Sequence, residues 1–83
     1  MSIMTKKNYI LYGTLGCHLC DDAQEVLLQA QRVMPIVWRT IDIALDQHLM
    51  TKYALYIPVL VSEQGQVLNW PFSLLDIQQL DNK

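Results

Sequence analysis

Alternating apolar and polar positions divide this chain into short strands and amphipathic helices. Residues 8–12 form a run with apolar side chains on both faces, which is typical of a strand inside a parallel sheet. Residues 36–43 are rich in β-branched and aromatic side chains and predict a second strand. Between them, apolar residues recur at the spacing of one buried helical face, and Pro35 is expected to end this helix. These residues are Leu19, Ala23, Val26, Leu27, Ala30 and Met34. Strand, helix and strand together predict a right-handed parallel βαβ unit.

The second half of the chain predicts a short helix, a hairpin and a final helix. Asp46 is placed to cap a helix that runs to about Ala54. The apolar runs 59–61 and 67–70 are separated by a polar segment containing Gly65, which predicts an antiparallel hairpin. Ser73 precedes a final helix whose apolar residues are expected to face the sheet. Those residues are Leu74, Leu75, Ile77 and Leu80.

Composition and charge narrow the class of protein. A chain of 83 residues, 52% hydrophobic and 17% charged, predicts a single domain over residues 1–83. The net charge of −2 and the six scattered Lys and Arg residues offer no basic stripe for nucleic acid. Residues 1–8 are followed by too few apolar residues for a signal sequence or a membrane span. We therefore expect a cytoplasmic protein without nucleic-acid or membrane partners.

The two cysteines of the chain, Cys17 and Cys20, stand where the first strand gives way to the first helix. In a cytoplasmic protein, such a pair favours redox turnover or metal binding over a permanent crosslink. A sulfur at a helix start faces unpaired backbone N–H groups and the positive end of the helix dipole, which favour thiolate over thiol. His18 either lowers the Cys17 pKa when protonated or is simply exposed to solvent. The alternatives to redox chemistry are two buried small hydrophobes and half of a zinc site.

Three local motifs, in the predicted order of elements, resemble the thioredoxin fold in its smallest, glutaredoxin-like form, as found in small bacterial proteins. The motifs are Cys17-His18-Leu19-Cys20, Tyr53-Ala54-Leu55-Tyr56-Ile57-Pro58 and Gln64-Gly65-Gln66-Val67. The resemblance implies an α/β fold, β-α-β-α-β-β-α, with three helices and a four-stranded mixed sheet in the order 2-1-3-4. It also implies a cis bond before Pro58, although base rates alone favour trans. In the family, the backbone of the residue before this proline, here Ile57, pairs with a disulfide substrate.

Several positions depart from the glutaredoxin pattern and bear on glutathione. Glutaredoxins usually carry a basic residue before the first cysteine, another shortly before the proline, and a Gly-Gly pair ahead of the last helix. Here these places are taken by Thr14, Tyr56 and Trp70-Pro71-Phe72. Ser73 and its helix start then remain as the main anion site, so we expect poor use of glutathione. Trp70 and Phe72 either form a rim that contacts a protein substrate or pack in the core.

These observations predict a thiol–disulfide oxidoreductase. Cys17 attacks a protein or low-molecular-weight disulfide, and Cys20 resolves the mixed disulfide. We expect Gly16, Ile57, Pro58, Trp70 and Ser73 to contact the substrate, and we expect a monomer without a bound cofactor or metal. The alternatives are a non-catalytic module that binds a partner around Ile57 and Pro58, and a dimer whose cysteines share a metal or an iron–sulfur cluster.

Overall fold

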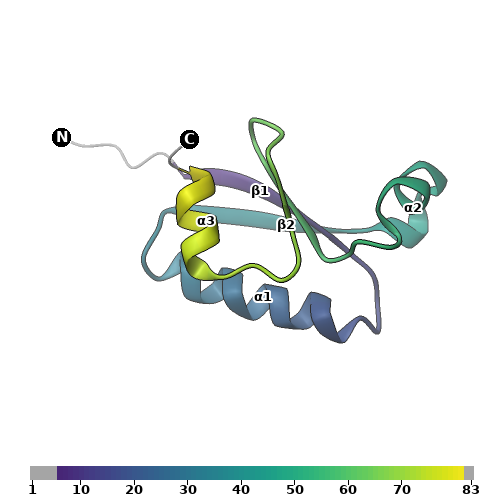
Figure 1. Cartoon of the computed structure of the whole chain (residues 1–83), viewed down its shortest axis with the longest axis horizontal. Helices are drawn as coiled ribbons and strands as arrows, with labels where there is room; N and C mark the ends of the chain where they lie inside the picture. The colour runs from purple at the N-terminus through teal and green to yellow at the C-terminus, as the bar shows by residue number, and fades with distance from the viewer. Residues whose placement is uncertain (1–5, 82–83) are drawn as a thin grey trace.

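A four-stranded sheet organises the protein (Figure 1), and the computed structural model describes residues 6–81. The elements follow the chain as β1 (Lys7–Gly13), α1 (His18–Gln31), β2 (Ile36–Asp42), the 3₁₀ helix η1 (Ile43–Leu45), α2 (Gln47–Tyr53), β3 (Val59–Ser62), β4 (Val67–Asn69) and α3 (Leu74–Asp81). The strand order is β2-β1-β3-β4, with β2 parallel to β1 and the other pairs antiparallel. The predicted fold class and sheet order are confirmed.

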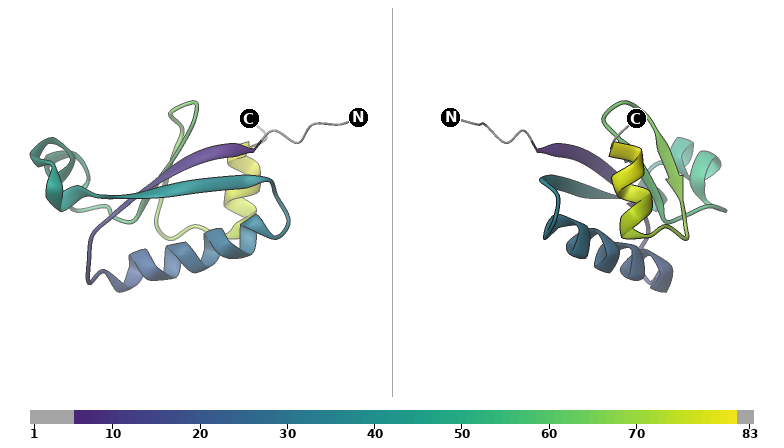
Figure 2. Two further views of the ribbon diagram at one scale, coloured as in Figure 1. Left: turned by 180° about the vertical axis from the view of Figure 1, so that it is seen from behind. Right: turned by 60° about the vertical axis from the view of Figure 1, so that its left-hand side comes forward.

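The core lies between one face of the sheet and the two longer helices. Tyr9 and Leu11 of β1 point to this side, where Leu27 of α1 and Ile77 of α3 pack against them. The short helix α2 lies beyond the end of the sheet and buries none of its residues. Figure 2 shows the same arrangement from two further sides. The opposite face of the sheet is therefore left largely uncovered.

Helix α1 differs from its predicted bounds at the C-terminal end. It stops at Gln31, before the predicted stop at Pro35. The N–H groups of Val33 and Met34 both donate to the Ala30 carbonyl, at 3.0 and 2.9 Å, which closes the helix with a tight turn. Such a turn suits a residue before proline, because proline disfavours the helical conformation there.

Two residues expected on buried helix faces are exposed instead. Leu19 is 49% exposed because it belongs to the first turn of α1, and Leu75 is 59% exposed in the first turn of α3. The later turns hold the core contacts, with Ile77 and Leu80 buried. Helical periodicity predicted the buried stripe but not how far along each helix the sheet covers it.

The strand and helix boundaries in the middle of the chain follow local caps. The Asp42 side chain accepts the Ala44 N–H at 2.9 Å, so β2 ends there and Ile43 enters η1 rather than the strand. Asp46 accepts the His48 and Leu49 N–H groups at 2.8 and 3.3 Å, which confirms its predicted role as the cap of α2. The hairpin strands form as predicted, except that β3 extends one residue further, to Ser62, and β4 ends one residue earlier, at Asn69.

Candidate redox site

Cys17 and Cys20 form a disulfide at the start of α1, with their Cα atoms 5.2 Å apart. Cys17 is the N-cap residue, and its sulfur accepts the backbone N–H of Cys20 at 3.1 Å. Cys17 is half-buried, whereas Cys20 is 7% exposed. A thiolate at the Cys17 sulfur would face the same N–H group and the positive end of the α1 dipole. The Cys17 sulfur therefore faces the start of α1, as expected from the sequence.

Two glycines shape the loop that carries this disulfide. Gly16 has φ +77°, a conformation that favours glycine, directly before Cys17. Gly13 ends β1, and a Cβ atom there would lie 2.9 Å from the Cys20 sulfur. The absence of a side chain at Gly13 therefore lets the Cys20 side chain pack directly against β1. Sequence reasoning missed this contact, although a glycine at the last strand position before the cysteines was the available signal.

Ile57 and Pro58 lie beside the end of β1. Tyr12 pairs with Val59 across β1 and β3, so the residues just before Val59 run next to the loop that leads to Cys17. The Tyr12 ring stacks on Tyr53 with centroids 4.6 Å apart, which ties the end of α2 to the same place. Pro58 is fully buried, and its bond to Ile57 is cis, as is the Trp70–Pro71 bond.

The backbone N–H of Ile57 is already engaged within the protein. It donates to the Tyr53 carbonyl at 3.2 Å. The resemblance implied that this residue offers its N–H and carbonyl to a substrate strand, so pairing through the N–H requires exchange of the bond to Tyr53.

His18 and Trp70, two further candidates, lie in different surroundings. His18 is exposed at the first position of α1, next to Cys17. Trp70 is half-buried and packs edge-on against Phe72, with ring centroids 5.1 Å apart. Phe72 belongs to the core, and Trp70 packs against it. Of the two interpretations of Trp70 and Phe72, a substrate rim and core packing, the structure supports core packing.

Ser73 caps α3, and its donors are occupied. The Ser73 N–H and Oγ both bond to an oxygen of Asp76, at 2.8 and 3.1 Å, and the Asp76 N–H donates back to Ser73 Oγ at 3.3 Å. This reciprocal pair is a capping box. The Asp76 carboxylate places a negative charge where an anionic substrate group was expected to bind, and like charges repel. The capped start of α3 is confirmed, but its consequence for the anion site was missed.

Apolar side chains are exposed in two loops near the disulfide. Leu15, between β1 and α1, is 90% exposed, and Leu55, between α2 and β3, is 91% exposed. Tyr56 follows Leu55 and is exposed as well. Figures 1 and 2 place both loops at the same end of the molecule. We call Leu15, Leu55 and Tyr56 the apolar rim. The sequence analysis did not recognise it, because an apolar residue in a loop carries no periodic signal.

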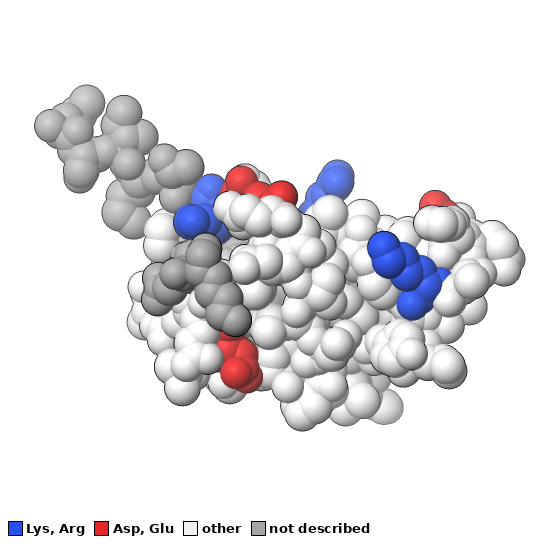
Figure 3. All heavy atoms as spheres, turned by 45° about the horizontal axis from the view of Figure 1, so that its top comes forward, with Lys and Arg blue, Asp and Glu red and all other residues white. Residues whose placement is uncertain are grey.

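Charged and metal-binding groups are sparse. On the face shown in Figure 3, the Lys and Arg side chains lie in separate places and form no continuous basic patch. Among residues 6–81, no group of three or more His, Cys, Asp and Glu side chains is placed to hold a metal ion. Over the same residues, none of the helices has the length and apolar character needed to cross a membrane.

The fold and the disulfide at the start of α1 together define the class of glutaredoxin-like, thioredoxin-fold domains, and a CxxC disulfide in this setting is consistent with thiol–disulfide redox chemistry. Within this class, the chain belongs to the family described as Glutaredoxin-like domain (DUF836), which matches residues 8–82.

Solved structures from two bacteria are similar to this chain. The X-ray structure of the structural genomics target protein XcR50 from X. campestris is 36% identical, covers 90% of this chain and 97% of its own, and has a TM-score of 0.79. The solution structure of the same target gives a TM-score of 0.76 at 36% identity, over 90% of this chain and 94% of that one. Protein Ne2328 from Nitrosomonas europaea, at 23% identity over 96% of both chains and a TM-score of 0.84, shares the fold. No curated protein matched.

Proposed function

We propose that this protein is a thiol–disulfide oxidoreductase that acts on disulfides in other proteins. The observation that carries the proposal is the position of the Cys17 sulfur as the cap of α1, with the Cys20 N–H directed at it at 3.1 Å. Backbone N–H groups and the helix dipole stabilise a thiolate, which is the reactive form of cysteine. Cys17 is also the more accessible of the two cysteines, since Cys20 is buried.

The reaction proceeds through two exchanges. The reduced Cys17 thiolate attacks one sulfur of the substrate disulfide, forms a mixed disulfide and releases the other substrate sulfur as a thiolate, which takes a proton from water. Cys20 then loses its proton and attacks the Cys17 sulfur. This step releases the second substrate thiol and leaves the Cys17–Cys20 disulfide. Two electrons pass from the protein to the substrate, and the reverse sequence oxidises a substrate dithiol.

The surroundings of the disulfide favour a protein substrate over glutathione. The apolar rim offers Leu15, Leu55 and Tyr56 to a partner, and burying such side chains on binding is favourable. Asp76 meanwhile fills the α3 start, where a glutathione carboxylate would bind. Near Cys17, the Ile57 backbone receives an extended substrate segment, and its N–H exchanges its bond to Tyr53 for one to the substrate, while Pro58 stays buried beneath. His18 modulates the thiolate from the next residue.

The test is a comparison of two substrates with one set of variants. The reduced protein is mixed with insulin, as a protein disulfide, and separately with a glutathione mixed disulfide. We expect faster exchange with insulin, and no exchange with either substrate for Cys17→Ser. Leu55→Ser should slow the reaction with insulin alone, and Leu75→Ser, which removes an exposed leucine from α3, is the matched control. Failure with both substrates refutes the oxidoreductase proposal, and faster exchange with glutathione refutes the assignment to protein substrates.

A further inference from the structure

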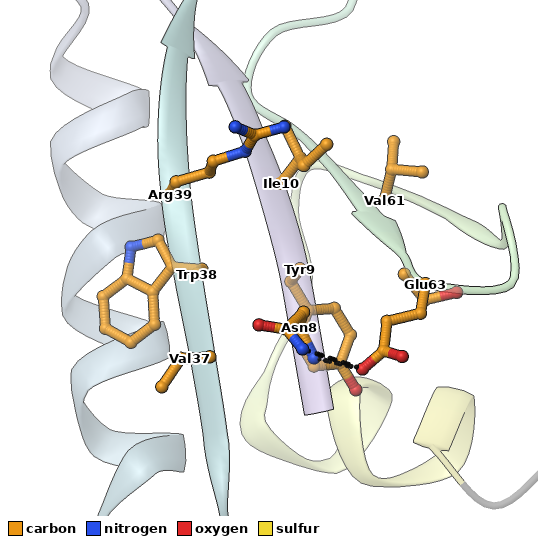
Figure 4. A pocket seen from close by; sticks show the side chains of 9 residues that line it. Asn8, Tyr9, Ile10, Val37, Trp38, Arg39, Val61 and Glu63 are labelled. Atoms are coloured by element: carbon orange, nitrogen blue, oxygen red, sulfur yellow. Dashed lines mark hydrogen bonds between the residues drawn. The ribbon is translucent and has the colours of Figure 1, made fainter. Parts of the chain in front are cut away.

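The face of the sheet opposite α1 and α3 carries apolar residues in the open. Strand residues alternate between faces, and since Tyr9 and Leu11 point into the core, Asn8 and Ile10 point the other way. Together with Val37 and Arg39 of β2, Val61 of β3 and Glu63 just after it, they line a hollow of about 530 Å³ (Figure 4). We call this surface the open face.

The open face carries the apolar residues expected of a sheet face that is covered by another layer. Ile10 lies on a central strand, between Arg39 on one side and Val61 on the other. Ile10, Val37 and Val61 are only half-buried, and Val67 of β4, the pair of Val61, is exposed. An antiparallel sheet with one face in water usually carries polar residues on that face. Helix α2 contacts this side at one end, through the stack of Tyr53 on Tyr12. The apolar row across the middle therefore lacks a covering element among the described residues.

The charges that flank this row have opposite signs. Arg39 stands on β2, and Glu63 stands beyond the end of β3, on the other side of β1. Figure 4 shows the Arg39 side chain extending from β2 toward Ile10, and Glu63 on the other side of β1. The Glu63 carboxylate accepts the Asn8 backbone N–H at 2.6 Å and the Asn8 side-chain amide at 3.3 Å. These contacts, the backbone one above all, lower the pKa of Glu63, so its charge persists to mildly acidic pH. A carboxylate has further lone pairs for a second donor.

We propose that a second copy of this chain packs on the open face and forms a two-fold symmetric dimer. A two-fold axis parallel to the strands and above β1 lays β2 of one copy over β3 of the other and sets the two Ile10 side chains face to face. Arg39 then lies above Val61 of the second copy, because both pair with Ile10 in the sheet.

In that arrangement, Glu63 of the second copy lies two residues further along the strand. That offset is about 6.6 Å, and packed sheets lie about 10 Å apart, so the two Cα atoms are about 12 Å apart. An extended arginine and a glutamate span this distance, and the two-fold axis forms the pair twice. A surface that carries both partners of an ion pair on its two flanks is complementary to itself, which favours a second copy over an unrelated protein.

The size of the open face sets the expected strength of the dimer. Four strands about 4.8 Å apart and a central strand of seven residues give a surface on the order of 20 Å by 20 Å. This is roughly 400 Å² per copy, below the standard size of specific interfaces and in the range of weak, transient ones, so we expect a dissociation constant on the order of 100 µM. The cysteines lie at the end of the sheet, next to the helical layer, so dimerisation leaves them accessible. The proposed dimer differs from the monomer expected from the sequence, and it does not depend on the proposed function.

Sedimentation velocity of the oxidised protein from about 1 µM to 1 mM tests the proposal. We expect a shift from monomer to dimer over this range. Ile10→Glu should weaken the dimer by more than tenfold, because it buries two facing carboxylates, while the control Leu75→Glu changes an equally apolar, exposed residue elsewhere and should leave it intact. Circular dichroism and disulfide exchange verify that both variants fold.

Reversing the charges of Arg39 and Glu63 distinguishes the proposed arrangement from non-specific association. Arg39→Glu alone and Glu63→Arg alone should each weaken the dimer, and the double variant should restore it. Both variants that change Glu63 lose the bond to Asn8, so comparison of these two isolates the pair between copies. A protein that stays monomeric at 1 mM, a dimer indifferent to Ile10→Glu, or a double variant no tighter than its single variants would overturn the proposal.

Discussion

The two longer helices of this protein begin with the same kind of contact but differ in what it leaves available. At α1, the cap is a sulfur, and the Cys20 N–H directed at it belongs to the other half of the disulfide. At α3, the cap is a hydroxyl, and Ser73 and Asp76 satisfy one another's donors. Both helix starts have first-turn backbone N–H groups without a partner inside the helix, and both have the positive end of the helix dipole. In α1 they act on the sulfur that we propose reacts, whereas in α3 they stabilise the fold.

This difference bears on substrate selection. A helix start that already holds a carboxylate gives little to an incoming anion, so the α3 start contributes stability in place of a glutathione site. In the proposed function, disulfide chemistry then depends on the α1 start and the apolar rim beside it.

The largest effect is expected at the α1 cap. Cys17→Ser should reduce exchange with protein disulfides by at least ~10³-fold, because a hydroxyl does not supply a thiolate. Serine is itself a good N-cap residue, so the stability of this variant should stay within about 1 kcal/mol of the reduced wild type. Stopped-flow exchange and urea denaturation measure the two quantities. Retention of activity would show that Cys17 is not the nucleophile.

Cys20→Ser separates attack from resolution at the same site. The variant should still form the mixed disulfide through Cys17 but should not release it, so one substrate chain accumulates per protein. Mass spectrometry of the intact adduct measures this stoichiometry, with Cys17→Ser as the control that traps nothing. Continued turnover would contradict the assigned role of Cys20.

The approach of Cys20 to the sheet provides the next effect. In Gly13→Ala, the added methyl group would lie 2.9 Å from the Cys20 sulfur, so the helix start must shift, at a cost of about 1–3 kcal/mol. Exchange should slow in parallel because the second cysteine is displaced. Gly65→Ala is the control, since its Cβ meets open space. Any strain from its φ of +84° would arise in the hairpin, far from the cysteines. Equal effects of both variants on exchange would refute the contact as a determinant of the site.

Sequence patterns predicted what depends on periodicity and helix caps, and they missed contacts that depend on the course of the loops. The element order and the caps at Asp46 and Ser73 follow from recognisable local patterns, and each was predicted. The contact of Gly13 with Cys20 and the bond from the Ile57 N–H to Tyr53 also join residues close together in the chain, but they depend on how the loops after β1 and α2 turn, which carries no periodic signal. Periodicity indicates which residues share a helix face, but Leu75 shows that it does not indicate whether the sheet extends under that turn.

At the α3 start, we expect a smaller and two-sided effect. Asp76→Ala should destabilise the fold by about 0.5–1 kcal/mol by removing half of the capping box. It should also free the Ser73 donors, so exchange with a glutathione mixed disulfide should rise by about two- to fivefold, the factor that ~0.3–1 kcal/mol of helix-start interaction corresponds to. Exchange with insulin should not change. Ser73→Ala, which also breaks the cap but removes an anion donor, is the control and should show the loss of stability alone.

The smallest effect is expected at Glu63, where a carboxylate accepts a strand N–H as Asp76 accepts the N–H of the cap residue Ser73. The Asn8 N–H holds the pKa of Glu63 below its usual value of 4.5, so its contribution to stability is present above that pH and is lost as the pH falls through the folded-state pKa. Glu63→Gln should therefore lower the melting temperature slightly at pH 6, and the difference from wild type should shrink towards pH 3. Thermal scans at micromolar protein measure this difference, with Glu25→Gln removing the same charge from the exposed side of α1. A difference that grows as the pH falls would mean that the contact with Asn8 does not favour the charged form.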